Sequence, residues 1–193
     1  MKRLQKVLGS LAVVAASLFV VTPAKASTDT VHIDIRVSIT ATKSLAAGTT
    51  SYDFGAMNVN ASSVSATAIN IQNDSGGLVE TYTMQGADAS SLGAGSPWTL
   101  AGSPGSDTYA LAAEFSTARP ADADGNWGSD NLTKASATDC DDTTFGNGTH
   151  AEAGDGVSSL AGQYDRSLWF RLKTPTAVSD TTQHLAQVTL AVK

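Results

Sequence analysis

The clearest chemical pattern in the sequence is a run of side-chain oxygens in the middle of the chain. Asp122, Asp124 and Asn126 occupy alternate positions, and Asp130 follows shortly after them. Hard oxygen ligands clustered in a flexible loop suit calcium. The glycine of this run comes too early for an EF-hand loop, and position 133 lacks the closing glutamate, so a solvated acidic loop is the alternative interpretation. No cofactor is required, and calcium is the one that the sequence could support.

The residue types used in hydrolysis do not form a recognisable catalytic pattern. Nucleophilic catalysis needs a serine or cysteine close to a histidine, often on a G-x-S-x-G turn, and this sequence has no such turn. Its histidines are His32, His150 and His184. Glu80 and Glu114 are candidates for a glycosidase pair, but both fall in strand-like segments where exposed carboxylates are ordinary. The sequence therefore predicts no catalytic residues and a protein that is not an enzyme.

Cys140 is the sole cysteine, so the chain cannot close an internal disulfide. Its neighbours Asp139, Asp141 and Asp142 are expected to raise the pKa of the thiol and make it a poor nucleophile. An incidental loop cysteine and an intermolecular disulfide are the two interpretations.

Exposed aromatic side chains would provide platforms for sugars. The candidates are Trp98, Trp127 and Trp169, and Trp169 alternates away from the apolar positions of its segment. Together with the acidic loops, they define one alternative function, a secreted module for carbohydrate-dependent or calcium-dependent binding, with a surface polysaccharide as partner.

The first 26 residues have the layout of a secretory signal peptide. Lys2, Arg3 and Lys6 precede an apolar run over residues 7–21, and Ala24-Lys25-Ala26 forms a small-residue cleavage site. The apolar run is too short for a typical membrane span. We expect residues 1–26 to be removed and residues 27–193 to form a single domain that is secreted, periplasmic or displayed on the cell surface.

Charge narrows the range of partners. Cleavage after Ala26 removes four of the 12 basic residues and none of the 18 acidic ones, which leaves a net charge of −10. Nucleic acid is not expected as a partner of such a chain, because phosphate binding needs a basic surface. Since no second long apolar stretch follows, the mature protein is not expected to be embedded in a membrane.

Short segments with a period of two dominate the mature chain and predict strands. They cover residues 31–40, 52–57, 64–71, 78–84, 109–115, 168–173 and 186–192, with a short segment at residues 98–100. Turn signals separate the segments, and residues 120–162 read mostly as loops. This pattern predicts an all-β protein with one antiparallel β-sandwich of the Ig-like or jelly-roll type.

The segment with the most regular alternation is residues 31–40, close to the start of the mature chain. One face of this strand carries five aliphatic side chains, namely Val31, Ile33, Ile35, Val37 and Ile39. Such a strand can complete its own sheet or add to the exposed edge of a neighbour. These five residues are the candidates for a strand donated between copies.

The order of these features resembles exported pilin-like or spore-coat-type β-sandwich subunits. The resemblance lies in the signal peptide, the alternating strand that ends near Ala41, the sequence Tyr52-Asp53-Phe54-Gly55, and the closing strand over residues 187–192. Those families build surface fibres or coats, often by donating a strand between neighbours. The resemblance implies a structural or adhesive surface protein that self-associates as a fibre or coat subunit.

Overall fold

The structure is a computed structural model that describes residues 45–73, 81–141, 143–146 and 165–193. All of them belong to one compact unit, Ile39–Lys193. The strand expected over residues 31–40, with its five candidate donor residues, lies outside the described residues.

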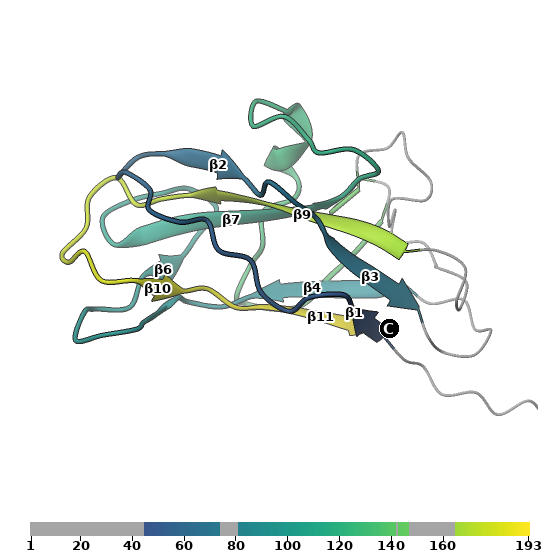
Figure 1. The fold of residues 1–193 in the computed structure, drawn as a ribbon, viewed down its shortest axis with the longest axis horizontal. Helices are drawn as coiled ribbons and strands as arrows, with labels where there is room; N and C mark the ends of the chain where they lie inside the picture. The colour runs from purple at the N-terminus through teal and green to yellow at the C-terminus, as the bar shows by residue number, and fades with distance from the viewer. Residues whose placement is uncertain (1–44, 74–80, 142, 147–164) are drawn as a thin grey trace, which may run out of the picture. The chain divides into compact units, whose positions relative to one another are not determined.

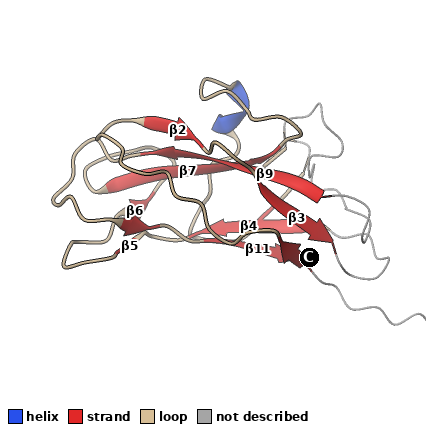
Figure 2. Ribbon diagram, in the orientation of Figure 1, coloured by secondary structure: helices blue, strands red, loops and turns tan. Residues whose placement is uncertain are grey.

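The described residues are almost entirely β structure, which confirms the expected class (Figures 1 and 2). The helical element that they contain is a single 3-10 turn, η1 (Gly125–Gly128). The strands, in chain order, are β1 (Leu45–Ala47), β2 (Ser62–Val64), β3 (Ile69–Asn73), β4 (Tyr82–Gly86), β5 (Ser90–Ser91), β6 (Thr99–Leu100), β7 (Thr108–Phe115), β8 (Thr138–Asp139), β9 (Asp165–Lys173), β10 (His184–Leu185) and β11 (Val188–Val192).

The strands form three sheets. The largest has the order β1-β3-β9-β7-β6, with β2 also paired to β9, and the others are β11-β4-β8 and β10-β5 (Figure 1). Pairing is antiparallel except between β6 and β7, which run parallel. The register between β7 and β9 sets Leu111 opposite Leu172 and Phe115 opposite Leu168. Aligned apolar pairs of this kind hold two strands in one register, because a slip by one residue would expose them.

The main core gathers the inward side chains of β7 and β9 with those of β4. It includes Leu111, Phe115, Leu168, Tyr82 and Met84, all of them buried. Tyr82 and Phe115 stack with ring centroids 6.1 Å apart. The period of two in the sequence therefore located the inner faces of β4, β7 and β9.

The outer face of β7 is also buried, which the sequence did not predict. Residues 109–115 are buried without a break, and Glu114 is fully buried although an exposed strand carboxylate was expected. The cause is a second, smaller cluster in which Trp127 of η1 packs with Ala112 of β7 and Val64 of β2. The loop that carries η1 covers this face.

Two expected strands differ in the structure. Residues 52–57 form no strand, because Asp53 accepts a hydrogen bond from the amide of Gly55, whose φ of 69° is left-handed. The strand expected over residues 64–71 is divided into β2 and β3, since the hydroxyl of Ser65 takes the place of a backbone acceptor for the amide of Phe170 at 3.1 Å. The extra residues between β2 and β3 resemble a bulge opposite β9.

Candidate functional site

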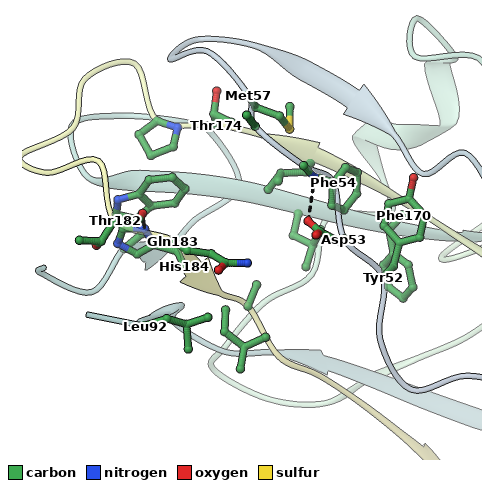
Figure 3. A pocket seen from close by; sticks show the side chains of 18 of the residues that line it. Tyr52, Asp53, Phe54, Met57, Leu92, Phe170, Thr174, Thr182, Gln183 and His184 are labelled. Atoms are coloured by element: carbon green, nitrogen blue, oxygen red, sulfur yellow. Dashed lines mark hydrogen bonds between the residues drawn. The ribbon is translucent and has the colours of Figure 1, made fainter. Parts of the chain in front are cut away.

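A large groove lies among the described residues. Its volume is about 910 Å³. Ile69 of β3, Leu111 of β7, and Phe170 and Leu172 of β9 line it from the largest sheet. The segments 50–59 and 178–188 form its other walls, and Figure 3 shows side chains from these separate parts of the chain around one space. The groove is therefore an extension of the apolar core toward solvent.

The segment 50–59 is held in place at both ends. The amide of Ala66 donates to the hydroxyl of Tyr52 at 2.6 Å, and the ring of Tyr52 packs edge-on against Phe54 with centroids 4.8 Å apart. At the other end, the hydroxyl of Thr174 donates to the carbonyl of Asn58 at 2.8 Å. The segment 50–59 is therefore anchored at both ends along the groove, although it forms no strand.

Exposed apolar side chains gather at this groove. Three large hydrophobic residues are exposed in the described part of the chain: Val59 by 50%, Leu92 by 58% and Leu185 by 47%. All three line the groove, although they come from three separate segments. Single exposed apolar residues are ordinary, but several around one hollow indicate a surface that binds something.

The groove reaches β11, whose outer edge is unpaired within the described residues. The amide of Ala87 donates to the carbonyl of Gln187, and the amide of Lys193 donates to that of Thr81, so the odd-numbered residues of β11 face β4. The backbone groups of Val188, Leu190 and Val192 therefore point to the other side, where no described strand pairs with them. Their side chains are half-buried against the core. This is a strand edge that can accept another strand.

One end of the groove is polar and tightly built. The rings of Trp98 and His184 stack with centroids 3.9 Å apart and an angle of 15°. The carboxylate of Asp180 accepts from the amide of Ser96 at 2.8 Å and from the amide of Thr182 at 2.9 Å. These contacts tie the loop 93–98 to the segment that leads into β10. Sequence reasoning did not find this cluster, because residues 96 and 184 are far apart in the chain.

The structure places the four candidate calcium ligands in different local roles, and Asn126 lies within η1. Asp122 accepts from the hydroxyl of Ser62, and Asp124 caps η1 by accepting from the amide of Asn126 at 3.1 Å. Asp130 is fully buried and accepts from the amide of Phe145 at 2.7 Å. Among the described residues, no three histidine, cysteine or acidic side chains form a group that could hold a metal ion. The calcium hypothesis stays a prediction that nothing in these contacts favours.

Asp130 has an unusual environment for an acid. Burial raises its pKa to about 7, although the hydrogen bonds from Phe145 and Ser129 and the charge of Arg171 lower it, and the charge of Asp124 raises it. Its second carboxylate oxygen is buried without a hydrogen-bond partner. A neutral carboxylic acid fits this position best, because its unbonded oxygen can then carry the proton.

The other residues selected from the sequence are mostly structural. Trp127 is fully buried, with its indole N–H donating to the carbonyl of Ala121 at 2.8 Å, so it cannot be an exposed sugar platform. Trp169 is half-buried beside it and donates to the carbonyl of Ser116 at 2.9 Å. Cys140 is buried, and its pKa is raised to about 12 by burial first and by Asp139, Asp141 and Asp130 next. A thiol in this setting is unreactive. His32, Glu80 and His150 lie outside the described residues.

Comparisons with known proteins give no family. No protein-family model matches the chain, and no curated protein or solved structure is significantly similar to it. In the part of the chain that the structure describes, no helix has the length and apolar character needed to cross a bilayer.

Proposed function

We propose that this protein is an exported structural or adhesive surface component that self-associates as a fibre or coat subunit. Residues 31–40 of one copy add to the free edge of β11 in another copy and cover the apolar groove. The fold in this proposal is an antiparallel β-sandwich of the Ig-like or jelly-roll type, without a catalytic site. The partner is a second copy of the chain.

One observation carries the proposal: a strand edge that no described strand pairs with leads into an apolar groove. The rim of this groove holds Val59, Leu92 and Leu185, the exposed large hydrophobic residues of the described structure. An added strand would satisfy the outward backbone groups of Val188, Leu190 and Val192. The aliphatic face of residues 31–40 has the apolar character that the groove requires. Its alternate positions His32, Asp34, Arg36, Ser38 and Thr40 are polar and suit a surface that faces solvent.

The energy of such an addition is comparable with the cost of holding two copies together. Burial of one aliphatic side chain stabilises by about 1.5–3 kcal/mol, so five of them contribute roughly 8–15 kcal/mol before entropy is subtracted. The loss of translational and rotational freedom costs about 4–15 kcal/mol. The range of the burial energy overlaps the range of this association cost. A donated strand is therefore stable only when most of its aliphatic face is buried.

The test uses two single-site variants of the mature protein, residues 27–193. Ile35→Asp places a charge on the aliphatic face of the donor, and Leu190→Pro removes an outward N–H from the free edge of β11. The matched controls are Arg36→Asp, which puts the same charge on the polar face, and Leu190→Val, which keeps the N–H. Light scattering and negative-stain microscopy measure the size distribution.

We expect a ladder of oligomers or filaments from the wild type and both controls, and monomers from each of the two test variants alone. An equimolar mixture of Ile35→Asp and Leu190→Pro should stop at dimers, because the first retains an intact acceptor edge and the second an intact donor strand. A monodisperse monomer of the wild type at every concentration would contradict the proposal. So would loss of folding in Ile35→Asp alone, since that result indicates pairing within one copy.

A further inference from the structure

The strand edge beside the groove is longer than β11. The amide of Leu92 donates to the carbonyl of Gln183 at 2.8 Å, so β5 bonds to the odd-numbered residues of this segment just as β4 does. The even-numbered residues therefore direct their amides and carbonyls to the opposite side. No described strand pairs with that side of β10 or β11. We call these residues the acceptor edge: His184, Ala186, Val188, Leu190 and Val192.

The acceptor edge belongs to one extended run of chain. From Asp180 to Lys193 the side chains alternate without a break, half-buried at even positions and exposed at odd ones. Such a period of two is the mark of a strand, even across the two residues that separate β10 from β11. The acceptor edge is about 26 Å long, at about 3.3 Å per residue. A single added strand of matching length could cover it.

Residues 31–39 match the acceptor edge in length and in period. Both runs contain nine residues, and each has five alternate positions that face inward or carry aliphatic side chains. Residues directly opposite each other on paired strands share a face. All five aliphatic positions meet the acceptor edge in only two registers. Val31 lies opposite Val192 in the antiparallel register and opposite His184 in the parallel one.

Charge distinguishes the two registers. The described residues that line the groove include Asp53 and Asp180 but no lysine or arginine. Asp180 precedes His184 by four residues, and Lys43 follows Ile39 by four. The antiparallel register therefore brings Lys43 to the end of the groove that holds Asp180. The parallel register carries Lys43 past the other end of β11, away from both aspartates.

The antiparallel register can form only between copies. Figure 1 shows β1 at the same end of the long axis as the C-terminal end of β11, with β10 toward the other end. Lys43 is two residues from Leu45, the first residue of β1, and two residues span at most about 7 Å. One copy therefore cannot place its own Lys43 beside its own Asp180. The parallel register, in contrast, keeps Ile39 at the end where β1 begins.

We propose that residues 31–39 of one copy bind the acceptor edge of another copy in the antiparallel register, and that Lys43 selects this register by pairing with Asp180. The carboxylate of Asp180 already accepts from the amides of Ser96 and Thr182, which hold it in place at the groove. A carboxylate has lone pairs left for an ammonium group. The inference rests on the proposed function for the exchange of strands, and it adds the direction and the residue that sets it.

Disulfide cross-linking at four solvent-facing positions tests the register in the mature protein, with Cys140→Ala as the background. The antiparallel register sets Asp34 opposite Thr189 and Arg36 opposite Gln187, while the parallel register exchanges these partners. The odd-numbered residues of β11 bond to β4, so they would form non-hydrogen-bonded pairs with an added strand. The Cα atoms of such pairs lie about 4.5 Å apart, which a disulfide can bridge.

We expect two double variants to give a ladder of disulfide-linked oligomers on non-reducing gels: Asp34→Cys with Thr189→Cys, and Arg36→Cys with Gln187→Cys. The matched controls combine the same four substitutions in the exchanged pairs and should give at least about tenfold less product. Cross-links between chains in the exchanged pairs would overturn the register but leave the proposed function standing. Cross-links within single chains in those pairs would overturn both.

The remaining outcomes are also decisive. Oligomers that form by light scattering but do not cross-link in any pair would overturn the acceptor edge as the site of strand addition. A mature protein that neither assembles nor cross-links would refute the proposed function, and the register with it.

A charge reversal tests the role of Lys43. Lys43→Glu should weaken assembly by about fivefold at low salt, with a smaller effect at high salt, because an exposed ion pair is screened. Arg36→Glu makes the same change of charge on the solvent-facing side and should assemble like the wild type. In an Asp180→Asn background, which keeps an oxygen for the amides of Ser96 and Thr182, Lys43→Glu should lose most of its effect. An equal loss of assembly in both backgrounds would overturn the pairing of Lys43 with Asp180.

Discussion

The two faces of the strands β7 and β9 differ in how they are covered. On the outer face, the loop that carries η1 buries Trp127 completely, and the guanidinium of Arg171 lies 5.1 Å from the centroid of its ring. On the inner face, Leu111, Phe170 and Leu172 lead into a groove whose rim leaves Leu92 and Leu185 exposed. The difference shows that the polar, acidic loop is a structural cover, while no described loop covers the apolar groove in the same way.

Polar contacts explain why the cover is closed. Arg171 donates to the carbonyl of Asp122 at 3.1 Å, and Arg119 donates to the carbonyls of Ser65 and Val64 at 2.8 and 2.7 Å. These bonds fix the loop to β9 and to the end of β2 in the largest sheet. No comparable set of bonds spans the groove among the described residues, where the anchors lie at its ends. The covered face should therefore govern stability, and the open one should govern association.

The largest expected effect comes from removing the centre of the cover. Trp127→Ala should lower the free energy of unfolding by about 3–5 kcal/mol, because it deletes a fully buried indole and leaves Arg171 without the ring that it covers. Urea denaturation followed by circular dichroism measures the change. Leu92→Ser, at the exposed rim of the groove, is the control and should change stability by less than about 0.5 kcal/mol. Similar losses in both variants would remove the distinction between the two faces.

The next effect concerns pH and the buried acid below the cover. The pKa of Asp130 is raised from an ordinary 3.8 to about 7 in the folded state. The contribution of Asp130 to the free energy of unfolding is therefore fully present below about pH 4 and is lost as the pH rises through about 7. The expected loss is on the order of 4 kcal/mol. Denaturant midpoints between pH 4 and pH 8 measure this dependence of stability on pH. Asp130→Asn, which cannot ionise, should flatten it, and an unchanged slope would show that other groups cause it.

A smaller effect on stability, but a specific one on association, is expected at the groove. The double variant Leu92→Ser and Leu185→Ser should weaken self-association by about tenfold or more and leave the denaturant midpoint nearly unchanged. Concentration-dependent light scattering measures the first quantity, and urea denaturation measures the second. Val59→Ser extends the series to the third exposed residue of the rim. Unchanged association in the double variant would place the contact surface elsewhere.

The smallest expected effect is that of calcium on the cover. Asp122, Asp124 and Asp130 already accept hydrogen bonds from Ser62, Asn126 and Phe145 respectively. We therefore expect millimolar calcium, compared with a chelator, to move the melting temperature by less than about 1 °C. A rise of several degrees would show that the ion binds the folded state and would revive the interpretation of this loop as a calcium site.

The sequence predicted some parts of this comparison and missed others. Alternation identified β7 and β9 and their inner faces, because a period of two reports the side that meets the core. It could not show that Glu114 and Trp127 are buried, since a loop that folds back over a second face leaves no periodic signal. It also marked residues 52–57 as a strand, where the bond between Asp53 and Gly55 turns the backbone instead.

By itself, the sequence determined the β class, the inner faces of the long strands and the net negative charge, since these depend on residue type and local spacing. Only the tertiary structure decided that Val59, Leu92 and Leu185 share one groove, that no described strand pairs with the outer edge of β11, and that His184 meets Ser96 and Asp180. The reason is physical: such contacts join residues far apart in the chain, and their positions follow from the pairing of strands and the packing of loops, which local patterns do not encode.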